Sequence, residues 1–205
     1  MKVLGITTSP RRGGNSDILL GEALKAAEAA GAEVSILSLN DYRVGPCIEC
    51  NACYKTGECY LPDDLPKVLE QILNADRIVF AAPVFFMGVC AQAKCLIDRA
   101  QCLWARKYVL NEPLFNEERD RRGLVIAVGG SKSKKMFESV QLTMKYYFDA
   151  IEVRYAANLF VNNTDDKGDI LDNREAMHEA VRLGRELIVG PAPGKKPTVS
   201  LILPE

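Results

Sequence analysis

The chain has 205 residues, a length that suits one domain built around a single core. Hydrophobic residues make up 48% and charged residues 26%, a balance that excludes a disordered or fibrous protein. Lys and Arg number 26 against 27 Asp and Glu, so the formal net charge of −1 gives no general attraction for nucleic acid or an anionic membrane. We expect a cytoplasmic protein, because no apolar run reaches ~20 residues and the N-terminus lacks a secretion signal.

Short apolar strands alternate with helical patterns along the chain. The first strand is predicted at residues 2–7 and is followed by a helix at 16–30, which Gly31 ends. Further strands are predicted at 33–39, 77–82, 124–128 and 152–161. The remaining helices are predicted from about residue 63, at 89–105, around 137–148 and at 173–189.

Five strands that alternate with five helices indicate an α/β fold, with a parallel sheet covered on both faces. The strand count favours a doubly wound five-stranded parallel sheet in the order 2-1-3-4-5. We expect one domain over residues 1–190 and a C-terminal tail over 191–205. In such sheets ligands bind beyond the carboxyl ends of the strands, which directs attention to the loops after strands one, three and four.

The loop after the first strand has the composition of an anion site. It leads into a helix N-terminus, where free N–H groups and the helix dipole favour a phosphate. Glycines let this backbone fold tightly, and the polar side chains supply donors and positive charge; the candidates are Ser9, Arg11, Gly14, Asn15 and Ser16. The loop matches neither the P-loop nor the Gly-x-Gly-x-x-Gly pattern, which argues against ATP or a standard dinucleotide. The alternative is a polar loop in which Ser16 simply caps the helix.

The loops after the third and fourth strands could form the walls of a flat ligand. The first is apolar where surface loops are normally polar, and comprises Pro83, Val84, Phe85, Phe86, Met87 and Gly88. The second allows close backbone approach and comprises Gly129, Gly130 and Ser131. An aromatic ring system needs apolar walls with a few backbone hydrogen bonds. Alternatively, the aromatic residues belong to the core or to a subunit interface.

These motifs, together with Lys94-x-x-Ile97-Asp98-Arg99, resemble the NADPH-dependent FMN reductase family of flavodoxin-like proteins. The resemblance covers roughly residues 1–190 and implies a flavodoxin-like fold with noncovalently bound FMN. It implies that Ser9, Arg11, Asn15 and Ser16 hold the phosphate, and that residues 83–88 and 129–131 flank the flavin ring. The sequence departs from the family at Phe86, near a position where relatives often carry Tyr followed by Trp or Phe, which implies a different ring environment.

Four of the seven cysteines lie in one irregular stretch between residues 47 and 59. Cys47, Cys50, Cys53 and Cys59 form a Cys-x2-Cys-x2-Cys-x5-Cys pattern, which is close to the ferredoxin spacing and favours a 4Fe–4S cluster. Structural zinc sites usually pair two Cys-x2-Cys units across a longer span, which is missing here. Zinc, a redox disulfide and an unmetallated loop stay open as alternatives.

The same spacing at this place resembles the iron–sulfur flavoproteins, a branch of that family, and implies FMN and a 4Fe–4S cluster together. These four cysteines lie in the stretch of residues 40–63, which we call the cysteine loop. It follows the strand beside strand one, so we expect it at the same sheet edge as the flavin loops. The strand spacing puts the two cofactors on the order of 10–20 Å apart. The prediction is an electron-transfer protein that exchanges electrons between these cofactors and a redox partner, such as a ferredoxin or NAD(P)H.

Two other functions stay open. One is an NAD(P)H-dependent FMN or quinone reductase without a functional cluster, and the other is a flavodoxin-like binding or regulatory module. We also expect a homodimer or homotetramer. Residues 106–122 and the proline-rich tail have no evident packing role in a lone five-stranded sheet, and the resemblance implies dimers or tetramers.

Overall fold

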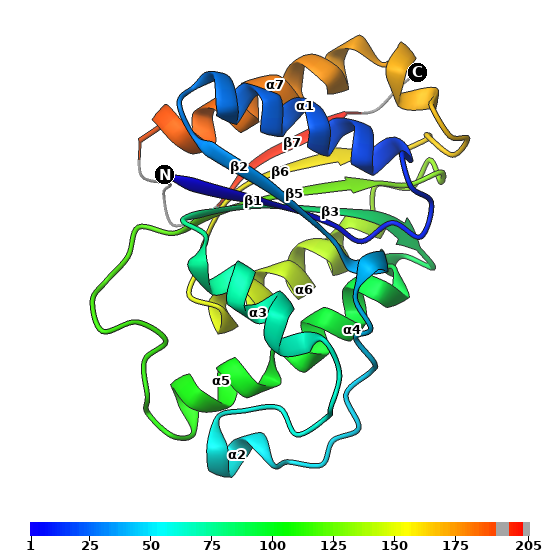
Figure 1. The fold of residues 1–205 in the computed structure, drawn as a ribbon. Coiled ribbons are helices and arrows are strands. Elements are labelled where there is room, and N and C mark those ends of the chain that lie inside the picture. Colours follow the sequence, from blue (N-terminus) through cyan, green and yellow to red (C-terminus); the bar gives the residue numbers. More distant parts are fainter. Residues whose placement is uncertain (192–196, 203–205) are drawn as a thin grey trace.

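A parallel sheet forms the centre of the molecule, and helices cover both of its faces (Figure 1). The computed structural model describes residues 1–191 and 197–202. The parallel strands lie in the order β2-β1-β3-β5-β6-β7; they are β1 (Lys2–Thr7), β2 (Glu33–Ser38), β3 (Arg77–Phe85), β5 (Arg122–Val128), β6 (Arg154–Val161) and β7 (Thr198–Ile202). The short β4 (Gly88–Val89) turns back along β3 in an antiparallel hairpin. The flavodoxin-like fold is thereby confirmed, and so is the predicted order of the first five parallel strands.

The strand β7 is an addition to the predicted sheet. It pairs in parallel with β6, from Ala157 opposite Thr198 to Val161 opposite Ile202. The expectation that the tail lacks a packing role is therefore wrong for residues 198–202. Its apolar run is short and follows several prolines, so the sequence alone did not mark it as a sheet edge.

The helices form two layers. On one face lie α1 (Asn15–Ala29) and α7 (Arg174–Val189), and on the other lie α3 (Leu65–Asn74), α4 (Ala91–Arg99), α5 (Gln101–Tyr108) and α6 (Met136–Ala150). The single helix predicted at 89–105 is in fact α4 and α5, which meet at Ala100. Single turns complete the chain: η1 (Leu39–Asp41), α2 (Cys53–Thr56) and η2 (Asp169–Asp172).

Alternation along the central strands supplies a separate core to each face of the sheet. In β3, Ile78 and Phe80 belong to the core beneath α3–α6, whereas Val79 and Ala81 belong to the core beneath α1 and α7. All four side chains are fully buried. A strand buried on both faces reads as one continuous apolar run, which is why the parallel sheet was predictable.

Buried arginines close the amino-terminal edge of the sheet. Arg121 donates to the main-chain oxygens of Ile72, Ala75 and Ile151, at the ends of α3 and α6. Arg122 donates to the carboxylate of Asp120 at 2.8 Å. The expectation that residues 106–122 have no packing role is therefore wrong at the end of that segment, because its arginines satisfy carbonyl groups that the helices leave unpaired.

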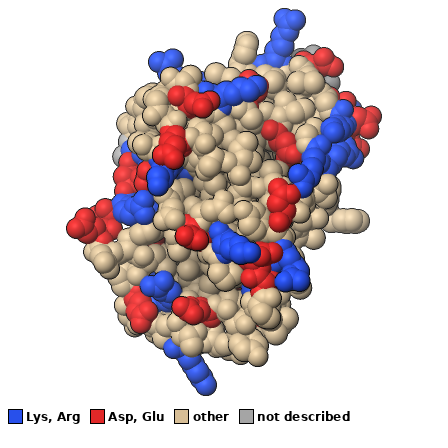
Figure 2. Space-filling model, viewed as in Figure 1, with Lys and Arg blue, Asp and Glu red and all other residues tan. Residues whose placement is uncertain are grey.

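The surface carries both signs of charge. On the face shown in Figure 2, Lys and Arg side chains alternate with Asp and Glu around a largely uncharged centre. Within residues 1–191 and 197–202, no helix combines the length and apolarity that crossing a membrane requires.

Candidate functional site

A cavity of about 340 Å³ lies at the carboxyl ends of β1, β3 and β5. It brings together most of the candidate residues from the three predicted loops: Ser9, Arg11, Gly14, Asn15, Ser16, Pro83, Val84, Phe85, Gly129 and Gly130. Pro10, Val128, Thr164 and Asp165 complete its wall. We call this the strand-end cavity. Sequence reasoning missed Thr164 and Asp165, which follow β6 in a loop that carries no recognisable motif.

The loop after β1 is folded tightly by its own backbone. The amide of Arg11 donates to Ser9 Oγ at 3.1 Å, and the amide of Gly14 donates to the main-chain oxygen of Arg11 at 3.0 Å. Gly13 has a φ of +65°, a conformation that favours glycine. The alternative in which Ser16 caps the helix is wrong, because Gly14 occupies the N-cap position, and no side chain of a described residue caps it. The start of α1 therefore borders the strand-end cavity at Gly14, Asn15 and Ser16, without a side-chain cap at Gly14.

Several polar side chains of this loop are already engaged. Arg11 donates to the main-chain oxygen of Asp165 at 3.1 Å. The Asn15 amide donates to the main-chain oxygen of Asp166 at 2.8 Å and accepts from the Gly168 amide at 2.9 Å. Asn15 thus fixes the turn after β6 and has one amide hydrogen left for a ligand.

Lys167 is a cation beside this loop that the sequence analysis did not predict. The ammonium group of Lys167 lies 3.6 Å from the point where a Cβ of Gly13 would stand. Lys167 follows the last predicted strand, far from the loop in sequence, so only the tertiary fold reveals it. It adds positive charge next to the α1 N-terminus, where an anion is already favoured.

The hairpin of β3 and β4 ends in a strained turn. Phe86 and Met87 have φ values of +46° and +64°, and Phe85 pairs with Gly88 across them, as in a type I′ turn. Bulky residues rarely adopt this conformation, so the turn is of interest as a functional element. The Phe86 side chain is fully exposed, so it is not a core residue. The structure does not bring Phe86, Met87, Gly88 or Ser131 to the wall of the strand-end cavity.

Glycine is required where the loop after β5 passes the neighbouring segments. A Cβ on Gly130 would lie 2.8 Å from Asp165 Cγ, and a Cβ on Gly129 would lie 2.6 Å from Met136 Sδ. The backbone at Gly129 and Gly130 is therefore packed closely against these neighbours, while both residues line the strand-end cavity.

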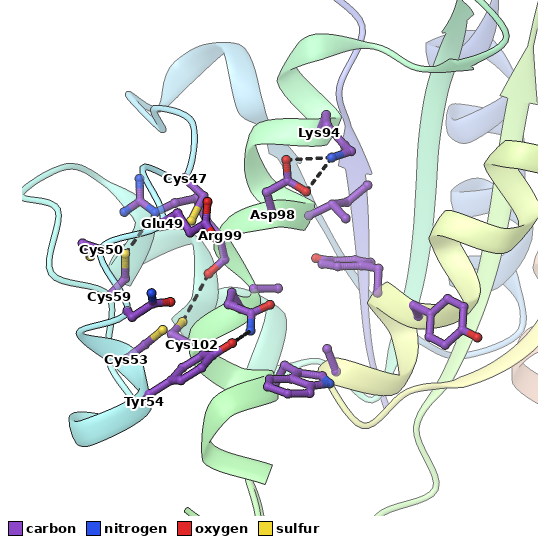
Figure 3. Close-up of a pocket in the computed structure, with 18 of the residues that line it drawn as sticks. Cys47, Glu49, Cys50, Cys53, Tyr54, Cys59, Lys94, Asp98, Arg99 and Cys102 are labelled. Carbon is purple, nitrogen blue, oxygen red and sulfur yellow. Dashed lines mark hydrogen bonds and ion pairs between the residues drawn. The ribbon is translucent and has the colours of Figure 1, made fainter. Parts of the chain in front are cut away.

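A second cavity, of about 640 Å³, is lined by all four cysteines of the predicted cluster (Figure 3). We call it the cysteine cavity. Cys47 and Cys50 are exposed, whereas Cys53 and Cys59 are partly buried. Glu49 and Asn51 have φ values of +55° and +57°, so the backbone reverses direction between successive cysteines. The chain then enters α2 at Cys53. All four cysteines of this loop therefore border one space.

Arg99, at the end of α4, is a buried cation beside these sulfurs. Its Nε donates to Cys59 Sγ at 3.0 Å, and its Nη1 donates to the main-chain oxygen of Gly45 at 3.1 Å. Both of its terminal nitrogens donate to the Asp63 carboxylate, at 2.7 and 3.1 Å. Its side chain is wholly inaccessible to solvent. Arg99 thus joins the cysteine loop to the helix through four hydrogen bonds.

The ionisation of Arg99 and Asp63 follows from the contacts between them and with their neighbours. Burial by itself lowers the pKa of Arg99, but hydrogen bonds to Asp63 and Cys59 outweigh it and raise that pKa. Burial likewise acts to raise the pKa of Asp63, but the bonds from Arg99 and from two backbone amides bring it below its usual value. The pair is therefore charged at neutral pH.

The donor set fits an iron–sulfur cluster by its chemistry. Burial raises the pKa of Cys53, and negative charge on Cys59, Cys50 and Cys47 raises it further, so four bare thiolates would repel one another. A cationic group among them would relieve this repulsion, and the Arg99 guanidinium already relieves part of it at Cys59. Within the described residues, no three or more His, Cys, Asp or Glu side chains converge tightly enough to hold a metal ion.

Cys102 also lines the cysteine cavity but differs from the four loop cysteines. It lies on α5 and is buried. Burial, together with charge on Cys59 and Cys53, raises the pKa of Cys102 to about 12. It therefore stays a neutral thiol and acts as a packing residue.

The walls of the two cavities share no described residue, and α4 lines only the cysteine cavity, through residues between Lys94 and Arg99. Cys90, just before α4, contacts the main-chain oxygen of Thr8 at 3.2 Å beside the strand-end cavity. Arg99, the last residue of α4, contacts Cys59. From Cys90 to Arg99 the helical rise amounts to about 13 Å.

The expectation that the cysteine loop lies at the flavin edge of the sheet is therefore only partly right. The loop begins there, where Asn40 donates to the main-chain oxygen of Ser9 at 2.6 Å. It then runs to the far end of α4, because Arg99 holds Gly45 and Cys59. Figure 1 accordingly shows α2 beside α5, below the helical layer.

Comparisons with known proteins identify relatives of this chain. The model of the NADPH-dependent FMN reductase family matches residues 1–165. An iron-sulfur flavoprotein of Methanocaldococcus jannaschii is 36% identical over 147 residues, 72% of each chain. An iron-sulfur flavoprotein of Archaeoglobus fulgidus is 35% identical over 145 residues, 71% of this chain and 70% of the relative.

A solved structure supports the fold. The NAD(P)H:quinone oxidoreductase from Methanothermobacter marburgensis aligns with a TM-score of 0.67 at 19% identity, over 91% of this chain and 98% of that one. The family match spans the loops of the strand-end cavity and the cysteine cluster alike. The chain therefore belongs to the NADPH-dependent FMN reductase family, in its iron–sulfur flavoprotein branch.

Proposed function

We propose that this protein is an electron-transfer flavoprotein that binds FMN in the strand-end cavity and a 4Fe–4S cluster on Cys47, Cys50, Cys53 and Cys59. One observation carries the proposal: the four cysteines line one cavity, the candidate residues of the loops after β1, β3 and β5 line another, and the two walls share no described residue. Relatives named iron-sulfur flavoproteins support it.

The strand-end cavity offers a place for each part of FMN. The N–H groups at the start of α1 and the hydroxyls of Ser9 and Ser16 would hold the phosphate. Arg11 and Lys167 would supply positive charge. The apolar segment Pro83–Phe85 and the close backbone at Gly129 and Gly130 would flank the flavin ring.

The cysteine cavity supplies four thiolate ligands, and Arg99 would orient one of them through its bond to Cys59. When bound, FMN exchanges one or two electrons and a 4Fe–4S cluster one, which suits conversion between paired and single electrons. We infer that the donor or acceptor is NAD(P)H or a redox protein such as a ferredoxin.

The test is cofactor analysis of protein purified without oxygen. We expect one FMN and about four iron atoms with matching sulfide per chain. Cys50→Ser should lose iron and keep FMN, because its sulfur lines only the cysteine cavity. Cys95→Ser is the matched control, since Cys95 is a partly buried cysteine of α4 outside the pattern, and should keep both cofactors. Less than about one iron per chain in the unaltered protein would reject the cluster.

The second candidate is an NAD(P)H-dependent FMN or quinone reductase without a cluster. The observation that favours it is the spread of the four cysteines, which share a cavity without converging tightly on one point within the described residues. A relative from Bacillus subtilis, named a putative NAD(P)H-dependent FMN-containing oxidoreductase, is 27% identical over 89% of this chain. Iron-free protein that binds FMN and oxidises NAD(P)H at an undiminished rate would establish this function instead.

A further inference from the structure

Among the described residues, Arg99 is the only buried charged side chain on the wall of the cysteine cavity. Its Nε donates to Cys59 Sγ at 3.0 Å, and no other side chain in the described part of the chain donates to one of the four sulfurs. Cys59 is partly buried, whereas Cys47 and Cys50 are exposed. The four cysteines are therefore not equivalent: one of them is held by a buried cation.

The other charges that line this cavity are open to solvent. Glu49 is exposed on the cysteine loop. Lys94 and Asp98 pair with each other along α4, with N–O distances of 2.6 and 2.7 Å (Figure 3), and their side chains are 53% and 41% exposed. Water and salt screen exposed charges, whereas a buried charge in direct contact with a group is screened much less. Arg99 therefore has the largest electrostatic effect at the sulfurs.

Asp63 balances this cation only in part. Its carboxylate accepts from both terminal nitrogens of Arg99, at 2.7 and 3.1 Å. It also accepts from the amides of Gly45 and Leu65, each at 3.1 Å. Among the hydrogen bonds of the described residues, none joins this carboxylate to a cysteine. The cation thus touches the Cys59 sulfur while the anion does not, so the positive charge prevails there.

We propose that Arg99 is a positioning residue that raises the reduction potential of the group held by the four cysteines, through its charge-assisted hydrogen bond to Cys59. The inference rests on the proposed function, because it requires a 4Fe–4S cluster on these sulfurs. Reduction adds one electron there and no proton to Arg99, whose guanidinium is already protonated. The added negative charge strengthens the attraction to a cation beside a ligand sulfur, so reduction becomes more favourable.

The experiment measures the reduction potential of the cluster in anaerobically purified holoprotein, by EPR during a titration in which dithionite supplies the electrons. Arg99→Met removes the cation, so the equilibrium constant for accepting one electron should fall at least tenfold, which corresponds to about 59 mV. Asp63→Asn removes the opposing charge and should raise the potential. Opposite signs for the two variants distinguish an electrostatic role from a merely structural one.

A double variant is needed because Arg99→Met leaves the Asp63 carboxylate without its main partner. Arg99→Met combined with Asp63→Asn removes both charges and leaves no unpaired ion behind. Its potential should lie below that of the unaltered protein and above that of Arg99→Met alone, because the lost cation touches the sulfur and the lost anion does not.

Arg106→Met is the matched control. Arg106 lies on α5 and packs against the cysteine loop, with its Cγ 2.3 Å from the point where a Cβ of Gly57 would stand. It does not line the cysteine cavity, and its nearest carboxylate is that of Glu112 at 3.9 Å. The potential should therefore stay unchanged in this variant.

A second readout uses the unaltered protein, labelled with ¹⁵N-arginine. Pulsed EPR of the reduced holoprotein should detect a nitrogen coupling from the guanidinium at Cys59, and Arg106→Met should retain it. Iron and flavin are measured on the same samples. Full iron with no nitrogen coupling, or with a potential that Arg99→Met does not lower, overturns this inference and leaves the proposed function standing. Absence of iron from the unaltered protein counts against the proposed function instead.

Discussion

At the scale of single residues, Arg99 holds the cysteine loop in place. Replacing it by Met leaves the Asp63 carboxylate without its main partner, in a site where little solvent reaches it. Removing one member of such a buried pair costs about 3–5 kcal/mol. We therefore expect Arg99→Met to lower the free energy of unfolding by that amount, measured by urea denaturation of the cofactor-free protein.

The control for this variant lies on the same helix. Lys94 forms a solvent-exposed ion pair with Asp98, so Lys94→Met should change the free energy of unfolding by less than about 1 kcal/mol. Similar losses for the two variants would mean that Arg99 does not anchor the loop.

A second residue-scale prediction concerns pH. Asp120 accepts hydrogen bonds from Arg122 and Arg77, and these hold the pKa of Asp120 below its usual value. Because this pKa is lower in the folded state, the unfolded chain takes up the proton first as acid is added. The contribution of the ionised Asp120 to the free energy of unfolding is full above about pH 4, and it is lost as the pH falls through the pKa of Asp120 in the folded state.

Asp120→Asn should therefore destabilise the protein at neutral pH and reduce the loss of stability between about pH 5 and pH 3. Unfolding by urea across this range measures the effect. If the free energy of unfolding of the variant falls as steeply between these pH values as that of the unaltered protein, Asp120 does not titrate in the way its contacts imply.

Residue types were predictable where local spacing carries the chemistry. Four cysteines at short intervals indicated one site, and the structure places all of them on one cavity. Lys167 could not be predicted beside the loop after β1, because its position there comes from neighbours far away in the sequence. Asn15 was predicted as a ligand donor, and its contacts with the turn after β6 were invisible for the same reason.

At the scale of elements, α1 and α7 pack closely against each other at Gly184. A Cβ on Gly184 would lie 2.2 Å from the main-chain oxygen of Ala23, so Gly184→Ala must separate the two helices. We expect a loss of about 1–3 kcal/mol in the free energy of unfolding, as for other overpacked sites. Chemical denaturation measures it.

Gly21→Ala is the matched substitution, and we expect it to change the free energy of unfolding in the opposite direction. Gly21 lies in α1, and a Cβ there would meet nothing within 4 Å. Gly21→Ala should stabilise the protein by about 0.5–1 kcal/mol through helix propensity alone. Destabilisation by Gly21→Ala, or none by Gly184→Ala, would contradict the packing described.

Elements with a clear period were predicted correctly, and those that depend on tertiary contacts were not. The strands β1, β3, β5 and β6 were predictable because each is a short, largely apolar run between turns. The break between α4 and α5 at Ala100 carries no Gly or Pro, so the sequence shows one continuous helical pattern there. The strand β7 forms only because β6 offers it an unpaired edge.

At the scale of the whole molecule, β7 raises the question of where the domain ends. We predicted a boundary at residue 190, whereas residues 198–202 pair with β6 and Arg122 donates to the main-chain oxygens of Gly190 and Pro191. A chain ending at residue 190 should fold but melt at a lower temperature, because it exposes β6 and leaves Ile202 out of the core. Circular dichroism measures this; an unchanged melting temperature would support the predicted boundary.

The homodimer or homotetramer stays a prediction that light scattering at micromolar concentration tests, with a monomer as the contradicting result. Unpacked segments no longer support it fully, since residues 198–202 pair with β6 and Arg121 donates to the main-chain oxygen of Ala75. The resemblance to the family still supports it.

The position of Arg99 at the end of α4 restricts which insertions this chain can tolerate. One extra residue within the helix would advance Arg99 by about 1.5 Å and rotate it by about 100°, turning the guanidinium away from Cys59. The connection between α5 and Asp120 is not helical, so an insertion there rotates no side chain about a helix axis. This connection could lengthen without disturbing either cavity. Length variation among related sequences should therefore collect in that connection and avoid the nine residues of α4.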